Sequence, residues 1–183
     1  DLFSGKGNVI LEIPYKKGEK IFHSAKKIAF SRDSRYIAAM FFEDETPVTR
    51  VYDIENKTKL SEFFGGVADF GYNNRLIQSS ATQSHHIEFK DIHKDTSLKT
   101  LRSNTRHIDI IKSILYSHKY DRFISVDRWG NYKFWDGITG APVKESNRFD
   151  NDFYSVLPAN NGRTIFFNHK RGVYAINLDN LNT

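Results

Sequence analysis

Three adjacent acidic residues are the first group in this 183-residue sequence whose residue types could do chemistry. Glu43, Asp44 and Glu45 lie between two apolar segments. A glycosidase needs two carboxylates that face each other across a cleft, and adjacent acids on one turn do not meet that geometry. We therefore expect a solvent-exposed hairpin tip that could contact a cation or a partner protein, and we predict no catalytic residue.

Three histidines form a second group, because His85, His86 and His93 lie within nine residues of one another. A zinc site needs three or four converging ligands, and the alternation of side chains along a strand places at most two of these on one face. We expect exposed strand residues and predict neither a metal site nor a cofactor. The chain has no cysteine, which excludes disulfides, thiolate metal sites and cysteine nucleophiles.

The basic residues are dispersed, although the formal net charge is +5. Nucleic-acid binding usually requires a concentrated basic patch, so nucleic acid is an unlikely partner. Lys170 and Arg171, followed by a glycine, lack the spacing of a phosphate-binding loop. No apolar run approaches the roughly 18 residues of a membrane span, and the compartment is not fixed by the sequence.

Arg128 and Trp129 are the strongest candidates for a binding contact, since Arg and Trp are enriched in the energetic centres of protein interfaces. They occupy a predicted turn between two strands. The alternative is that Trp129 folds back over its own sheet.

A repeat must position these groups. Alternating strands end in a recurring polar marker at Asp53, Asp91, Asp136 and Asn177, at separations of 38, 45 and 41 residues. Each marker is preceded by an apolar hairpin with a polar turn, and the first three are followed by a shorter strand. Four short antiparallel strands in about forty residues are typical of a β-propeller blade. We therefore predict an all-β protein built from such blades.

Residues 124–136 resemble the second half of a WD repeat, including its Trp135-Asp136 pair, and Arg106-His107 stands where such repeats carry Gly-His. The resemblance implies a WD40-like propeller in which His107, Ser125, Asp127 and Trp135 form a hydrogen-bonded structural network. Asp127 lies eight residues before Trp135 rather than the usual six or so, and Trp129 occupies the usual position.

The repeat places blades at about 23–63, 64–101 and 102–146, with partial blades at 1–22 and 147–183. Four to five blades fit an incomplete ring within a larger propeller; the alternative is a small ring with an irregular first blade. An open arc would expose apolar sheet faces. We therefore expect self-association, or additional blades from the same or another chain.

The resemblance implies a non-catalytic scaffold that binds other proteins through loops on one face of the propeller. Two alternatives stay open. One is a hydrolase or glycosidase-like propeller enzyme with acidic residues in a central funnel. The other is a binder of phosphate, phosphoinositide or nucleic acid that uses basic loops such as Lys170-Arg171, since phosphoinositide-binding propellers carry a similar Arg-Gly element.

Overall fold

The described part of the chain is all-β, which confirms the predicted class. The computed structural model describes residues 21–80, 85–94, 96–101, 107–145, 153–159, 163–169 and 172–179. These residues form fourteen strands and one short 3-10 helix, η1 (Tyr72–Asn74), and they contain no α-helix. Within these ranges no helix is long and apolar enough to cross a membrane. Residues 1–20 of the first partial blade, predicted at about 1–22, lie outside the described residues.

The strands pair antiparallel with their neighbours in the sequence. The first seven are β1 (Ile21–Phe30), β2 (Tyr36–Glu43), β3 (Thr46–Asp53), β4 (Thr58–Phe70), β5 (Leu76–Ser80), β6 (Ile87–Asp91) and β7 (Thr96–Leu101). The next four are β8 (Ile111–Ser117), β9 (Arg122–Asp127), β10 (Tyr132–Asp136) and β11 (Pro142–Glu145). The last three are β12 (Phe153–Ala159), β13 (Thr164–His169) and β14 (Gly172–Asn177). They form sheets of seven, four and three strands.

The seven-stranded sheet results from the length of β4. The predicted blades at 23–63 and 64–101 meet between residues 63 and 64, but β4 runs through this boundary. Its residues up to Phe64 pair with β3, and those from Gly65 onward pair with β5, with a bulge after Gly65. A Cβ at Gly65 would lie 2.6 Å from the Ser79 carbonyl oxygen, so a glycine permits the close approach that joins the two pairings.

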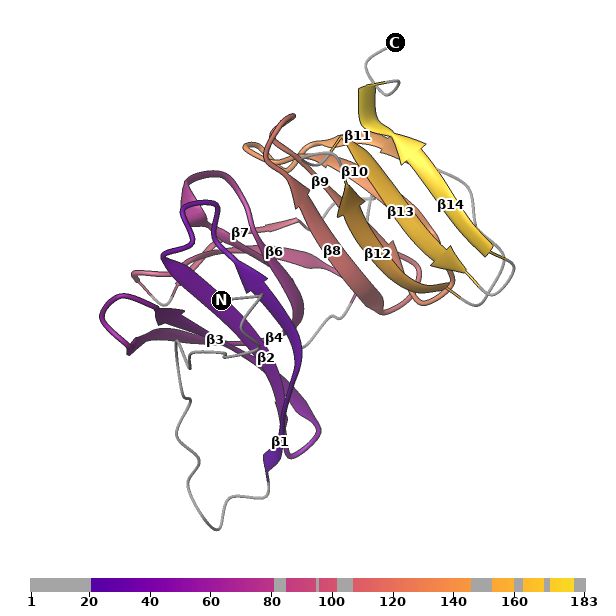
Figure 1. Ribbon diagram of the computed structural model, residues 1–183. Helices are drawn as coiled ribbons and strands as arrows, with labels where there is room; N and C mark the ends of the chain where they lie inside the picture. Colours follow the sequence, from indigo (N-terminus) through magenta and orange to yellow (C-terminus); the bar gives the residue numbers. More distant parts are fainter. Residues whose placement is uncertain are drawn as a thin grey trace, which may run out of the picture.

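We name the strand groups by their pairing. Sheet A is β1–β3 with the first half of β4, and sheet B is the second half of β4 with β5–β7. Sheet C is β8–β11, and sheet D is β12–β14. Figure 1 shows the groups following one another in chain order, with β1 and β14 at opposite ends.

Each sheet has two faces, which we call leading and trailing, and the strand register shows which residues on a face correspond from one sheet to the next. On the leading face, one residue from each of the first three strands lies side by side: Phe30, Ile37 and Tyr52 in sheet A; Phe70, Leu76 and Lys90 in B; Tyr116, Phe123 and Trp135 in C; Pro158, Ile165 and Ile176 in D. The trailing face carries Ala29, Ala38 and Val51 in sheet A; Asp69, Ile77 and Phe89 in B; Leu115, Ile124 and Phe134 in C; Leu157, Phe166 and Ala175 in D.

Three apolar cores join these faces. The trailing face of sheet A packs on the leading face of B, and the same relation joins B to C and C to D. In the second core the rings of Phe123 and Trp135 stack at 5.7 Å, and Phe89 meets Phe123 edge to face. Sheet-on-sheet packing of this kind hides apolar residues that a single sheet would leave in water.

The recurring polar markers start the turns that follow the third strand of each sheet. The side chains of Asp53, Asp91 and Asp136 each accept a backbone N–H two or three residues later, and the Asn177 side-chain oxygen accepts the Asp179 N–H. Asn can replace Asp because both side chains offer the same acceptor.

Candidate functional site

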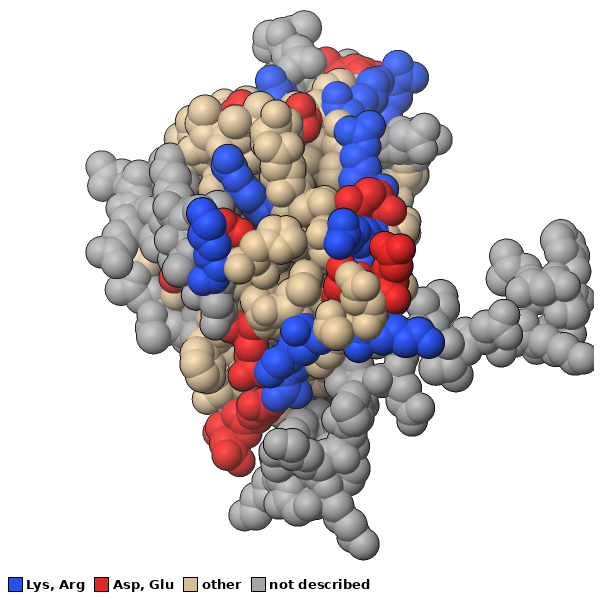
Figure 2. Space-filling view, turned by 90° about the vertical axis from the view of Figure 1, so that its left-hand side faces the viewer, with Lys and Arg blue, Asp and Glu red and all other residues tan. Residues whose placement is uncertain are grey.

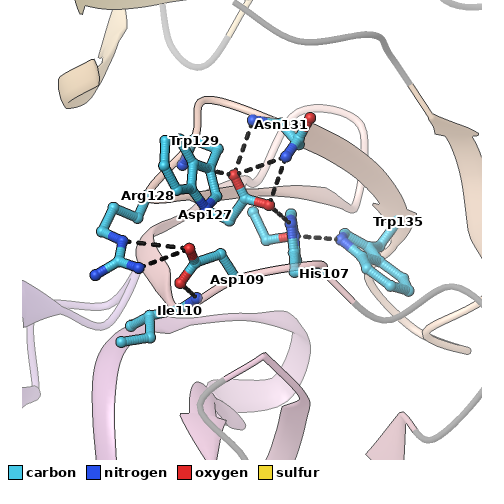
Figure 3. Close-up of polar contacts among 9 residues, drawn as sticks. His107, Asp109, Ile110, Asp127, Arg128, Trp129, Asn131 and Trp135 are labelled. Carbon is cyan, nitrogen blue, oxygen red and sulfur yellow. Dashed lines mark hydrogen bonds and ion pairs between the residues drawn. The ribbon is translucent and has the colours of Figure 1, made fainter. Parts of the chain in front are cut away.

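Sheet C buries a chain of four polar side chains, which the structure brings together as the resemblance implies. Trp135 Nε1 lies 2.7 Å from Ser125 Oγ, which lies 2.6 Å from His107 Nε2. His107 Nδ1 lies 3.3 Å from an Asp127 carboxylate oxygen. Three strands or loops supply them, because Ser125 and Asp127 lie on β9, Trp135 on β10, and His107 just before β8. Figure 3 shows His107 between Asp127 and Trp135.

The donors and acceptors of this network match a neutral imidazole that carries its proton on Nδ1. An indole N–H can only donate and a carboxylate can only accept. The Trp135 N–H therefore donates to Ser125 Oγ. With the neutral imidazole, the Ser125 hydroxyl donates to His107 Nε2, and the His107 Nδ1–H donates to Asp127. A neutral imidazole with its proton on Nδ1 satisfies all of these groups. Because His107, Ser125 and Asp127 are fully buried, the network ties the loop before β8 to β9 and β10.

Asp127 also organises the turn between β9 and β10. Its carboxylate accepts the backbone N–H groups of Trp129 and Asn131 and the Asn131 side-chain amide. Burial favours the neutral acid, but the hydrogen bonds from His107 and Asn131 outweigh it and hold the pKa of Asp127 below its ordinary value. Asp127 therefore joins the network although it lies eight residues before Trp135.

The same turn carries Arg128 and Trp129 to the surface. The Arg128 guanidinium donates to Asp109 at 2.9 and 3.2 Å and lies over the Trp129 ring at 5.6 Å. The Ile110 amide, with the Arg128 guanidinium, holds the pKa of Asp109 below its ordinary value. A backbone bond from Arg128 N–H to the Ile110 carbonyl fixes the two loops together. Figure 3 shows the Arg128 guanidinium directed at the Asp109 carboxylate.

Exposed apolar side chains surround this ion pair. Ile108 is 86% exposed, Ile110 39% and Trp129 36%. We call Ile108, Asp109, Ile110, Arg128 and Trp129 the loop patch. Sequence reasoning identified Arg128 and Trp129 but missed the other three. The Asp-Arg-Trp-Gly-Asn run is a turn signal, whereas no sequence pattern links Asp109 to Arg128.

The acidic tip lies at the hairpin between β2 and β3, away from sheet C. Asp44 and Glu45 have φ of 45° and 68°, the positive values of a two-residue hairpin turn. The Glu43 carboxylate accepts from the guanidinium of Arg50, which also donates to Glu62 at 2.7 Å. One of the three acids is therefore engaged in an ion pair on its own sheet.

The expectation of three exposed strand histidines is wrong, because His86 is buried and His85 is half-buried, and all three lie outside β6. His85 contacts the His86 ring, and His93 lies at the other end of β6 against Tyr36. Within the described ranges, no three His, Asp or Glu side chains are close enough to hold a metal ion. Lys170 and Arg171 lie outside the described residues.

A charged pair that sequence reasoning also missed lies between sheets A, B and C. The Lys27 ammonium on β1 donates to the Ile114 carbonyl on β8 at 2.8 Å. Asp69 on β4 accepts the backbone N–H groups of Phe70 and Tyr116. Burial lowers the pKa of Lys27 and raises that of Asp69, and each group's charge opposes the shift of the other. These contacts link three sheets at their first strands.

Basic side chains on the surface are intermixed with acidic ones. Figure 2 shows blue and red groups side by side on the face that it presents, with uncharged surface between them. Several of the cations form ion pairs, including Arg35 with Asp53 and Arg163 with Asp179. This arrangement gives little support to a polyanion-binding surface.

Comparison with known proteins shows the fold and no family. No protein-family model matches the sequence, and no curated protein matches it either. Among solved structures, the computationally designed Ika4 protein is similar over 94% of this chain and 99% of its own, with a TM-score of 0.67 and 15% identity. The β-propeller domain of Cps50 (Swd1) from Myceliophteria thermophila is similar over 85% of this chain, with a TM-score of 0.67 and 14% identity. The designed Ika8 protein is similar over 82%, with a TM-score of 0.61 and 16% identity.

The lengths covered differ among these structures. This chain spans 52% of the Cps50 (Swd1) chain and 46% of the Ika8 chain. The chain is similar in fold to these propellers. It corresponds in length to about half of the two longer chains.

Proposed function

We propose that this chain forms consecutive blades of a WD-repeat-like propeller and serves as a scaffold that binds other proteins through the loop patch on sheet C. The observation that carries the proposal is the loop patch itself, where a tryptophan, an arginine and two isoleucines are exposed at one end of a rigid sheet. Tryptophan and arginine are enriched among the residues that dominate the energetics of protein interfaces.

The buried network below the patch supports this proposal. Asp127 accepts hydrogen bonds from the turn that presents Trp129, while His107 and Ser125 tie that turn to the strands beneath. A fixed turn loses little conformational entropy when it binds, which favours affinity. The ion pair with Asp109 also orients the Arg128 guanidinium but leaves it accessible to a partner, because the Arg128 side chain is 55% exposed.

The test is site-specific photo-cross-linking in extract from cells that contain the protein. A photoreactive residue replaces Ile108 in one variant and Ile138 in the matched control. Ile138 is also exposed, but it lies in the turn after β10 at the opposite end of that strand from Trp129. We expect a defined protein adduct at position 108 and none at position 138.

The double variant R128A/W129A should reduce that adduct at least tenfold, because truncation of interface anchors commonly costs more than about 1.4 kcal/mol. Equal adducts at both positions would contradict the proposal. So would the absence of an adduct at position 108, most clearly if the chain also hydrolysed a glycan or an ester in a substrate panel.

A further inference from the structure

The Arg128 guanidinium in the loop patch is held on one edge only. Its Nε–H and one Nη2–H donate to a single carboxylate oxygen of Asp109, at 3.2 and 2.9 Å. A guanidinium carries five N–H donors in one plane, and within the described ranges the two Nη1–H groups and the outer Nη2–H have no acceptor. These three N–H groups form the outer edge of the guanidinium, and the Arg128 side chain is 55% exposed. In Figure 3 the guanidinium lies on the side of Asp109 away from His107.

Contacts within the loop patch fix the direction of this outer edge. The guanidinium lies over the Trp129 ring at 5.6 Å, and the Trp129 side chain donates a hydrogen bond to Asp109. Asp109 also accepts the Ile110 backbone N–H at 2.6 Å. Because an oriented side chain loses less conformational entropy on binding than a free one, Arg128 is prepared to bind a second acceptor.

Arg50 shows that one guanidinium in this protein serves two carboxylates. Its Nε–H donates to Glu62 at 2.7 Å, and its Nη2 donates to Glu43. At Arg128, Asp109 takes the first of these positions, and no acidic residue of the described ranges takes the second. A carboxylate matches the outer edge of a guanidinium, because its two oxygens accept two parallel N–H bonds.

Apolar side chains and a second cation border Arg128. Ile108 is 86% exposed and Ile110 39%. Lys112 is exposed on β8 and forms no salt bridge with another described residue. Its Cα lies at most about 7 Å from that of Ile110, which is comparable with the screening length of about 8 Å at physiological salt. Since the Asp109 side chain is only 12% exposed, the accessible surface combines apolar groups with positive charge.

We infer that the partner contributes an aspartate or glutamate whose carboxylate binds the outer edge of the Arg128 guanidinium, while apolar residues next to it pack on Trp129 and the two isoleucines. This inference rests on the proposed function and names the chemistry of the partner. Sheet C packs on sheet B with one face and on sheet D with the other, so the loop patch stands on a sheet that is enclosed on both sides. A paired, charge-assisted hydrogen bond is among the strongest that proteins make, and it therefore specifies the acid.

The experiment selects short random peptides, displayed on phage, against the immobilised chain. Peptides are kept when they bind the wild type and do not bind R128A/W129A, a criterion that does not itself require an acid. We expect the kept peptides to share an aspartate or glutamate close to apolar residues. Replacement of that acid by its amide counterpart should weaken binding to the wild type by about tenfold or more in a fluorescence titration, because it removes a charge-assisted pair.

Two variants of the chain separate the paired hydrogen bonds from charge alone. R128K keeps the positive charge but lacks the planar pair of donors. Binding of the acid peptide and its amide counterpart to R128K should therefore differ by less than about threefold. R32A is the matched control and should keep the full difference, since Arg32 is exposed in the turn after β1 and pairs with no described acid. Circular dichroism shows whether each variant is folded, and the comparison of peptides on the wild type needs no variant.

Several results would overturn the inference: no peptide that passes the selection, kept peptides without a shared acid, or amide counterparts that bind the wild type equally well. A full difference retained in folded R128K would do the same. So would tighter binding of a peptide with phosphoserine in place of the acid, because the guanidinium would then prefer phosphate. The proposed function fails separately, by the absence of the adduct at position 108. An adduct at that position, together with peptides that need no acid, would leave the proposed function standing and refute only this inference.

Discussion

Replacing Ser125 with alanine removes the central group of the buried network. Ser125 Oγ accepts from Trp135 Nε1 at 2.7 Å and donates to His107 Nε2 at 2.6 Å. The variant therefore leaves one buried donor and one buried acceptor without partners, and each such group costs about 1–3 kcal/mol. We expect S125A to lower the free energy of unfolding by about 2–4 kcal/mol, which is a large share of the roughly 5–15 kcal/mol of a typical domain.

Urea unfolding, followed by tryptophan fluorescence and circular dichroism, measures this loss. The chain offers a matched control in Ser61, which is buried and whose hydroxyl has no hydrogen-bond partner among the described residues. S61A should change the free energy of unfolding by no more than about 0.5 kcal/mol in the destabilising direction. The double variant S125A/W135F should cost less than the sum of its single changes, because it removes both partners of one bond. If S125A were as stable as S61A, the network would contribute nothing.

Three further predictions concern titratable groups. K27M should lower the free energy of unfolding by about 1–3 kcal/mol in urea titration, because it leaves Asp69 without its nearby cation; a neutral effect would contradict the role of this pair between sheets. His118 should titrate below its ordinary pKa of 6.5 in an NMR titration, since burial and the nearby Arg32 disfavour its charged form; protonation then costs stability as the pH falls below 6.5, and a value of 6.5 or higher would refute this. The folded pKa of Asp127 lies below the ordinary 3.8, so its carboxylate contributes stability that is present above about pH 4 and lost as the pH falls through the folded pKa. In urea titrations, the free energy of unfolding that D127N loses relative to the wild type should therefore shrink from pH 7 to pH 3. A loss that stayed constant over this range would contradict the role of Asp127.

Much of the fold was predictable because the repeat depends on hydrogen bonds and side-chain alternation between residues that are close in sequence. Asp53, Asp136 and Asn177 recur since each accepts an N–H of the turn that follows it, and alternation of apolar residues shows which side chains face a core. The continuous β4 was not predictable in the same way. Its bulge depends on how Gly65 approaches Ser79 on the neighbouring strand, and that contact has no local signature.

The candidate site was predictable only where a residue type carries its own signal. Trp129 and Arg128 stand out because their residue types are common in protein interfaces, and His107 and Ser125 follow from the WD-repeat resemblance. Asp109 could not be found, because its pairing with Arg128 joins two loops that are distant in sequence. Lys27 and Asp69 were missed for a similar reason, since their contacts reach β8 from β1 and β4.

Successive repeats form sheets that stack face to face in chain order. Nuclear Overhauser contacts between methyl groups test this most directly. We predict contacts between Val51 and Leu76 for sheets A and B, between Ile77 and Ile114 for B and C, and between Ile124 and Ile165 for C and D, because each pair belongs to one core. A spectrum with contacts inside each sheet but none across these pairs would contradict the stacked arrangement.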